Sequence, residues 1–333
     1  MSLSFTSDIG VFVGGGVTRT FYGFRQHPYR SRVTLRGGVA PGAGAYQAEL
    51  MADFRGPVPG AALEFRLRAS GIEALRFYGF GNETVAPAPD EFYRVRQEQY
   101  HVTSSLALPV SGAVRLAAGP ELSVAHTEQG GGSFLDSVRP YGAGTFAQAG
   151  FRAGLEADTR DRPAAPARGV LLSLGGKFYP AVLDTKSAYA VLHGEAATYL
   201  TAATFPAATL ALRTGATKVF GRPPFYDAAY LGGFATVRGL PEQRFAGDGA
   251  AYGNAELRVK LANTWFPVPG DFGVFALGDA GRVYWDGDDS DQWHTAMGGG
   301  LWLALLDRTS TLTLAVARSE ERTRVYLRAG FSY

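Results

Sequence analysis

Apolar and polar residues alternate along many short stretches of this chain. Between residues 254 and 261 one parity is polar and the other apolar, with Asn254, Glu256, Arg258 and Lys260 set against Ala255, Leu257, Val259 and Leu261. The same two-residue period runs through residues 46–55, 63–68 and 324–333. A period of two predicts β-strands whose two faces meet different surroundings. Alternation alone fits both a soluble sandwich and a membrane barrel with a polar lumen.

The alternating stretches predict an all-β fold of about sixteen strands, an even number as in single-chain bacterial barrels. The strands are expected near residues 9–21, 30–40, 45–55, 61–69, 72–83, 91–108, 112–126, 140–159, 169–180, 187–201, 206–220, 251–263, 271–284, 293–305, 310–319 and 322–333. Both chain ends then lie at the periplasmic rim. We predict one domain over residues 1–333, and its assignment as a transmembrane antiparallel barrel rests on sequence marks that resemble one family.

Two classes of connection are expected between these strands. Short turns are predicted at residues 41–44, 110–112 and 267–271, and longer loops near residues 127–139, 221–250 and 285–292. Short turns that alternate with long loops are typical of the periplasmic and extracellular ends of an outer-membrane barrel.

Composition narrows the class of protein. No stretch approaches the roughly 18 to 20 consecutive apolar residues of a membrane helix, and the mean hydropathy of −0.04 fits apolar residues that alternate with polar ones. The chain has no cysteine, which excludes disulfides and thiol chemistry. Its formal charge of +2 comes from interspersed acids and bases, so the basic stripe of a nucleic-acid-binding protein is absent.

Four sequence marks, in order, resemble one family. The first is Asp158-Thr159-Arg160-Asp161-Arg162-Pro163, followed by Pro166 and Gly169. The second is the Gly-rich segment from Leu231 to Leu240, which contains Val237-Arg238-Gly239. The third runs from Phe275 through Asp279 to Gly281, and the fourth is the C-terminal stretch 327–333. Together they resemble the outer-membrane polypeptide-assembly and transport barrels of the BamA, TamA and FhaC type, although Leu240 stands where that family usually has Tyr or Phe.

The resemblance implies that the extracellular loop around Arg238 folds back into the lumen. Arg238 would then reach the wall where Glu256 and Asp279 project, and a guanidinium can bind a carboxylate through two hydrogen bonds. Gly232, Gly233 and Gly239 leave room for the fold-back. The alternative is an exposed loop arginine without a partner. Because a buried pair stabilises little after desolvation, we expect Val237, Arg238, Gly239, Glu256 and Asp279 to form a latch that fixes the loop's position.

The predicted first strand, residues 9–21, is expected to close the barrel against residues 322–333. Its glycines Gly14, Gly15 and Gly16 weaken pairing because they add entropy cost and no side-chain contact. In the resembled family the wall opens laterally at this seam, where an incoming strand adds to the exposed edge. The alternative is that the glycines ease barrel curvature. Phe331 and Tyr333, assigned to the same seam, resemble the terminal signal that the assembly machinery reads.

Enzymatic and metal-binding interpretations find little support in the sequence. The five histidines are scattered without metal-ligand spacing, and no nucleophile elbow or phosphate loop occurs. His193 and Glu195 would share a strand face, where a lumenal hydrogen bond is the favoured interpretation. The acidic run 286–291 fits a calcium site or, more simply, a solvated loop. We predict no catalytic residue, no metal and no cofactor.

The predicted function is insertion, assembly or translocation of polypeptides at the bacterial outer membrane. The expected partners are outer-membrane lipids, unfolded outer-membrane or secreted polypeptide clients, and periplasmic proteins or lipoproteins; nucleic acid is not expected. One alternative is an anchor and export pore for an N-terminal passenger such as a patatin-like enzyme, and another is a passive porin. Residues 1–8 lack the basic and apolar regions of a signal peptide. The POTRA repeats of the resembled family do not occur within residues 1–333, so either they were trimmed away or this member lacks them. We therefore expect a mature or trimmed chain with a replacement Met1.

Overall fold

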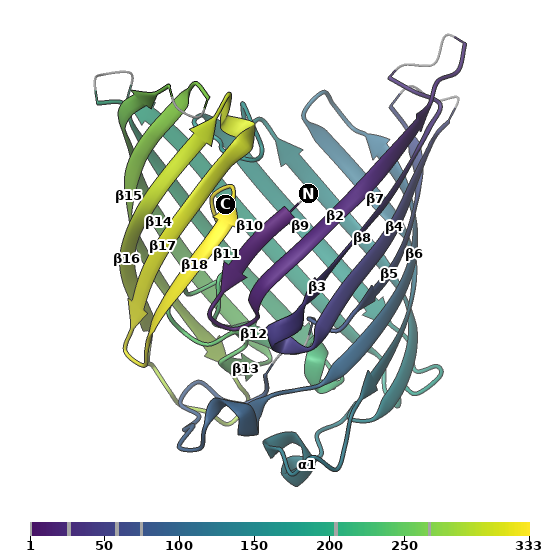
Figure 1. The fold of residues 1–333 in the computed structure, drawn as a ribbon. Coiled ribbons are helices and arrows are strands. Elements are labelled where there is room, and N and C mark those ends of the chain that lie inside the picture. The colour runs from purple at the N-terminus through teal and green to yellow at the C-terminus, as the bar shows by residue number, and fades with distance from the viewer. Residues whose placement is uncertain (1, 25–27, 57–59, 74–75, 203–205, 266–267) are drawn as a thin grey trace.

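Sixteen antiparallel strands close into a barrel in the computed structural model, which describes residues 2–24, 28–56, 60–73, 76–202, 206–265 and 268–333 (Figure 1). Neighbours in the barrel are neighbours in sequence, apart from the seam where β1 meets β18. The strands are β1 Ser2–Thr6, β2 Gly10–Phe21, β3 Ser31–Ala40, β4 Ala45–Arg55, β5 Ala62–Ser70, β6 Gln97–Pro109, β7 Val114–Thr127, β8 Thr145–Asp158, β9 Gly169–Tyr179, β10 Tyr189–Ala202, β11 Ala208–Phe220, β14 Gly249–Thr264, β15 Gly270–Tyr284, β16 His294–Leu305, β17 Thr311–Ser319 and β18 Thr323–Ala329. The predicted all-β barrel of sixteen strands is confirmed.

The remaining elements are short and lie in the connections. A two-stranded ribbon of β12 (Ala229–Leu231) and β13 (Phe245–Gly247) forms within the loop between β11 and β14. One α-helix, α1, and four 3-10 turns complete the described elements: α1 Phe134–Val138, η1 Pro41–Ala43, η2 Asp90–Tyr93, η3 Phe225–Asp227 and η4 Arg308–Ser310.

The predicted strand at 72–83 is wrong. Residues 74 and 75 lie outside the described residues, and the rest of this stretch forms bends and isolated bridges. Its successive residues Phe77 and Tyr78 are both buried, and Gly79 and Gly81 adopt positive φ, so the two-residue alternation is broken. The missing strand is supplied by β1, which was not predicted. The count of sixteen is therefore reached with a different set of strands.

The connections divide between two ends of the barrel. One end, here the turn end, has the short connections 56–61, 110–113 and 306–310; the opposite loop end has the long connections 71–96, 128–144, 221–248 and 285–293. Residues 41–44 join β3 to β4 at the loop end, although they were grouped with the short turns. The extra strand predicted at 72–83 reversed the assignment of each earlier connection to the turn end or the loop end. Of the predicted turn 267–271, Pro267 lies outside the described residues.

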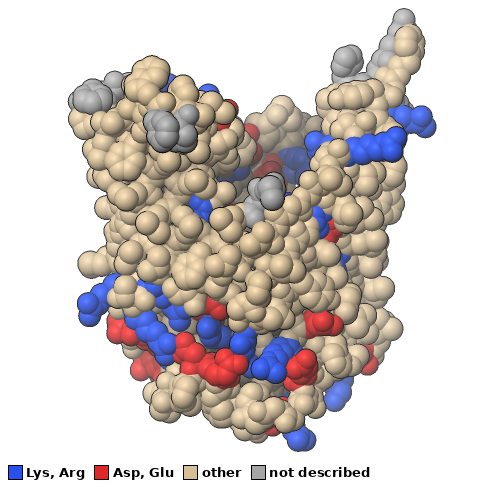
Figure 2. Space-filling model, viewed as in Figure 1, with Lys and Arg blue, Asp and Glu red and all other residues tan. Residues whose placement is uncertain are grey.

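Strand alternation separates an apolar outer face from a polar lumen. On β5, Leu63, Phe65 and Leu67 are each at least 40% exposed on the outside, while Glu64 and Arg66 point inward. Figure 2 shows a band with few charged side chains around the middle of the visible face, with charged side chains gathered toward the loop end. Of the helices in the described ranges, none has the length and apolar character to cross a membrane.

At the loop end the connections pack on one another. Phe77 and Val95 from connection 71–96 meet Leu135 of α1, together with Phe225 and Ala246 from connection 221–248. Phe80 stacks on Trp285 of connection 285–293, with ring centroids 4.5 Å apart. We call this cluster the cap. It covers the loop end, where these connections lie beneath the barrel in Figure 1.

Candidate functional site

Connection 221–248 follows the inner wall of the barrel. Its buried side chains Leu231, Val237 and Leu240 pack against Val283 of β15 and Ala296 of β16. Gly239 has φ +93°, and a Cβ there would come within 2.8 Å of the Ser319 backbone nitrogen on β17. Glycine is therefore required at this close approach of the loop to the wall.

Arg238 lies between two carboxylates of the wall. Its Nε and Nη2 donate to the Asp279 carboxylate at 2.8 and 2.7 Å, and its backbone nitrogen donates to Asp279 Oδ2 at 3.0 Å. Nη1 forms an ion pair with Glu256. The side chains of Arg238, Asp279 and Glu256 are 2%, 0% and 1% exposed. The structure thus brings Arg238, Glu256 and Asp279 together, with Val237 and Gly239 packed on either side.

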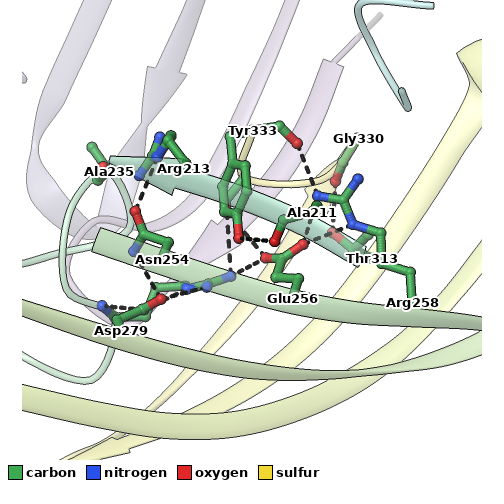
Figure 3. Close-up of polar contacts among 12 residues, drawn as sticks. Ala211, Arg213, Ala235, Asn254, Glu256, Arg258, Asp279, Thr313, Gly330 and Tyr333 are labelled. Carbon is green, nitrogen blue, oxygen red and sulfur yellow. Dashed lines mark hydrogen bonds and ion pairs between the residues drawn. The ribbon is translucent and has the colours of Figure 1, made fainter. Parts of the chain in front are cut away.

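Wall residues also hold the backbone that precedes Arg238 (Figure 3). Asn254 Nδ2 donates to the Thr236 carbonyl at 2.6 Å and to Asp279 at 2.8 Å. Arg213 Nε donates to Asn254 at 3.0 Å, and its Nη2 donates to the Ala235 carbonyl at 2.5 Å. Sequence analysis did not assign Asn254 or Arg213 to the site. The sequence feature that could have identified them is that both occupy polar positions of an alternating strand.

The C-terminal residues enter the same network. Arg238 Nη1 donates to Ser332 Oγ at 3.3 Å, and Ser332 Oγ donates to Glu256 at 3.2 Å. Arg258, itself bonded to Glu256, donates to the Tyr333 main-chain oxygen at 2.9 Å. The Tyr333 ring lies 4.7 Å from the Arg213 guanidinium carbon. The loop and the C-terminal segment are therefore held by one group of charged side chains.

The seam between β1 and β18 is short. Among the residues that the structure describes, two register pairs join the strands, Phe5 with Leu327 and Thr6 with Tyr326. The Ser7 hydroxyl extends the contact, because it donates to the Val325 carbonyl at 3.2 Å and accepts from the Val325 nitrogen at 3.0 Å. Gly330 has φ +77°, beyond which the chain leaves the wall.

The predicted seam residues must be corrected. Strand β1 lies between β2 and β18, so Gly14, Gly15 and Gly16 do not face the C-terminal strand; they pair with β3, and Gly14 also with Ser2 of β1. Phe331 and Tyr333 point into the lumen after the turn at Gly330. The prediction failed because the start of the chain was interpreted as a trimmed end, so the alternation of Leu3 and Phe5 with polar residues was not recognised as a strand.

The sequence matches the Omp85 superfamily domain over residues 43–305. This chain belongs to the Omp85 superfamily. It resembles BamA from Haemophilus ducreyi lacking POTRA domains 1–3 with a TM-score of 0.70 and 14% identity, covering 99% of this chain and 69% of that one. It also resembles CdiB from Acinetobacter baumannii, with a TM-score of 0.56 and 13% identity, covering 99% of this chain and 59% of that one. For CdiB from Escherichia coli the TM-score is 0.60 and the identity 13%, covering 99% of this chain and 62% of that one. No curated protein gives a sequence match.

Membership in the Omp85 superfamily, together with the sixteen-stranded barrel, places the protein in the bacterial outer membrane. Short turns of such barrels face the periplasm and long loops face the cell exterior. The turn end is accordingly periplasmic and the loop end extracellular. The loop containing Arg238 enters the Omp85 barrel from the extracellular side.

A second ion cluster lies at the extracellular end of the seam. Asp8, in the turn between β1 and β2, is paired with Arg76 of connection 71–96 and, at 2.7 Å, with Arg324 of β18. It also accepts from the Glu242 backbone nitrogen at 3.2 Å. The Asp8 and Arg324 side chains are 1% and 4% exposed. This carboxylate joins both sides of the Omp85 seam to the lumenal loop, and nothing in the sequence pattern singled it out.

Glu242 makes the loop sensitive to pH. Burial, with the nearby Asp8 charge as a smaller cause, raises the pKa of the Glu242 carboxyl from 4.5 to about 7. Between those values the folded protein holds a proton that the unfolded chain has released, so stability falls as pH rises through this window. We expect the urea midpoint of unfolding, followed by tryptophan fluorescence, to fall between about pH 5 and pH 7.5.

The matched variant for this prediction is Glu242→Gln. It should be nearly insensitive to pH over the same range, because it has no carboxyl to titrate. A fall of equal size in the variant would show that other groups govern the dependence.

The other candidate residues have structural partners. Glu195 accepts from the Tyr252 hydroxyl at 3.0 Å and forms an ion pair with Arg213 at 3.8 Å. In the acidic run, Asp288 accepts from the backbone nitrogens of Asn82 and Ser290 at 2.8 and 3.0 Å. Within the ranges that the structure describes, no group of three His, Asp or Glu side chains has metal-binding geometry. The latch and the seam are therefore the candidate functional site.

Proposed function

We propose that this Omp85 barrel promotes the insertion of polypeptides into the outer membrane, or their passage across it, through its seam. The resemblance to BamA, TamA and FhaC motivates the polypeptide client. The observation that carries the proposal is the seam of two register pairs. Other neighbouring strands pair over longer stretches, for example five residues between β1 and β2 and thirteen between β10 and β11.

Unpaired backbone at the seam suits strand addition. Leu3 and Ser4 of β1 pair with β2, while Arg328 and Ala329 of β18 pair with β17. Neither pair of residues meets its counterpart across the seam. An incoming extended segment would find backbone donors and acceptors there and would add to the sheet through main-chain hydrogen bonds.

The latch has a positioning role in this mechanism. Arg238 holds the loop and, through Ser332, the C-terminal segment on the lumen side of the seam. We propose that these contacts set how much of the β18 edge is available to a client. A buried ion pair is suited to fixing an arrangement, since its net contribution to stability is small. The proposal needs no catalytic residue or cofactor.

The test measures how fast a small unfolded outer-membrane barrel inserts into liposomes with and without this protein. Phe5→Cys combined with Leu327→Cys would place a disulfide across the seam, and the chain has no native cysteine to interfere. We expect the protein to accelerate insertion and the oxidised pair to abolish the acceleration until a reductant is added.

The matched control is a disulfide within the wall, from Leu50→Cys and Leu67→Cys, which are register partners on β4 and β5. It should leave insertion fast. Equal inhibition by both disulfides would rule out a special role for the seam. No acceleration by the unmodified protein would instead favour an anchor or export pore, and a large steady conductance in planar bilayers would favour a porin.

A further inference from the structure

One wall of the lumen has an excess of positive charge. On strands β3 to β8 the positions that face the lumen include seven arginines and five acids. These are Arg32, Arg36, Arg55, Arg66, Arg68, Arg115 and Arg152, and Glu49, Asp53, Glu64, Glu121 and Glu156. We call this surface the basic wall. The wall around the latch is balanced instead, with Arg213, Arg238, Arg258 and Lys260 against Glu195, Glu256, Asp271 and Asp279.

The basic wall encloses a pocket of about 380 Å³. Four arginines and two acids contribute its charges: Arg32, Arg66, Arg115, Arg152, Asp53 and Glu64. The pocket lies toward the periplasmic end, because Arg32 follows the turn at 22–30 and Arg115 follows the turn at 110–113. Figure 2 shows the barrel hollowed at this end, with charged side chains visible inside.

Two of the four arginines remain available to a ligand. Arg66 binds Glu49 at 3.2 Å, and Arg115 is paired with Glu64. Arg32 and Arg152 each make a single ion pair at 4.0 Å, to Asp53 and Glu121, and within the described residues neither donates a hydrogen bond. Their side chains are 47% and 42% exposed. A guanidinium has five N–H donors in a planar fork that fits a carboxylate, so both groups retain most of their binding capacity.

We propose that the basic wall binds carboxylate-bearing segments of unfolded polypeptides that enter the lumen from the periplasm. This inference rests on the proposed function and adds a preference for acidic clients. A polypeptide suits the surface better than a lipid, because the pocket lies inside the lumen whereas the outer face is apolar. The cap covers the extracellular end, so the accessible approach is from the periplasmic side.

The experiment measures fluorescence anisotropy of labelled peptides with the whole protein in detergent micelles. The probes are a decamer of glutamate, and decamers of glutamine and of lysine as comparisons. We expect only the glutamate peptide to bind, and its affinity to fall as salt is added, because the wall is hydrated and screened. Arg32→Gln combined with Arg152→Gln should weaken binding about five- to tenfold, as two charge-assisted contacts are lost.

The control variant combines Lys218→Gln with Arg318→Gln, two exposed cations on the outer face near the extracellular end. It changes the net charge by the same amount and should leave binding intact. The gel mobility of unheated samples will show that both variants remain folded. Equal binding of the glutamine peptide, or equal weakening in the two variants, would overturn the proposal.

The binding assay does not require the seam to open. Normal client insertion without peptide binding would therefore reject the basic wall alone. Peptide binding that depends on Arg32 and Arg152, without client insertion, would reject the proposed function and retain the acidic-segment site.

Discussion

Arg238→Ala should free the lumenal loop and destabilise its docked state by about 3–5 kcal/mol, the usual penalty for removing one partner of a buried ion pair. The variant leaves Asp279 without its two guanidinium bonds and Glu256 with Arg258 as its remaining cation. The loss should appear as faster chymotryptic cleavage within connection 221–248, measured in detergent micelles, because the substitution leaves the aromatic cleavage sites of the loop unchanged. Cleavage there reports the open population of the loop.

Two further variants sharpen this test. Arg238→Lys keeps the charge but loses the planar fork, so its cleavage rate should lie between those of the parent and the Ala variant. Arg318→Ala removes an exposed cation from the outer face and should behave like the parent. If Arg238→Ala were cleaved no faster than Arg318→Ala, Arg238 would not be what holds the loop.

Asp8→Ala should loosen β1 from the barrel. The substitution leaves Arg324 and Arg76, which are 4% and 12% exposed, without their shared acceptor. Arg324 then keeps the more distant Asp90, at 4.0 Å, as its acidic partner. A penalty of about 3 kcal/mol is expected for the loss of the closer carboxylate, and this corresponds to roughly 100-fold faster local opening. Hydrogen exchange of the peptide spanning residues 2–9, measured by mass spectrometry, reports that opening directly.

The comparison variant is Asp271→Ala. It breaks the pair between Lys260 and Asp271, whose side chains are 28% and 30% exposed, so solvent screens the loss and exchange at β1 should not change. Faster hydrogen exchange of residues 2–9 in Asp8→Ala alone would show that the ion cluster around Asp8 keeps the seam closed. Similar exchange in both variants would leave the two register pairs as the principal contact.

Alternation predicted most of the strands because each meets lipid on one face and a polar lumen on the other, while the four family marks favoured a membrane barrel over a soluble sandwich. It failed where that condition does not hold. Phe77 and Tyr78 are successive residues that are both buried at the loop end. In β1 the alternation covers five residues at the very start of the chain and was not recognised as a strand.

The motif around Arg238 identified the residues of the latch, but the lateral contacts could not be read from sequence. Ser332 and Glu256 lie 76 positions apart, and their hydrogen bond exists only once the barrel has closed. Asp8 is more remote still, since it is 316 positions from Arg324. Such pairs depend on the curvature of the whole sheet. Local spacing along one strand does not determine them.

The cap makes the two routes out of the lumen unequal. Separating it would expose Phe77, Val95, Leu135 and Phe225, at roughly 1.5–3 kcal/mol for each large apolar side chain. Parting β1 from β18 breaks a few backbone hydrogen bonds, each worth about 0.5–1.5 kcal/mol, together with the Asp8 contacts. The vertical exit therefore meets a hydrophobic barrier made of several large side chains. The lateral exit is held by a small number of polar contacts, so under the proposed function a client would leave toward the bilayer more readily than through the cap.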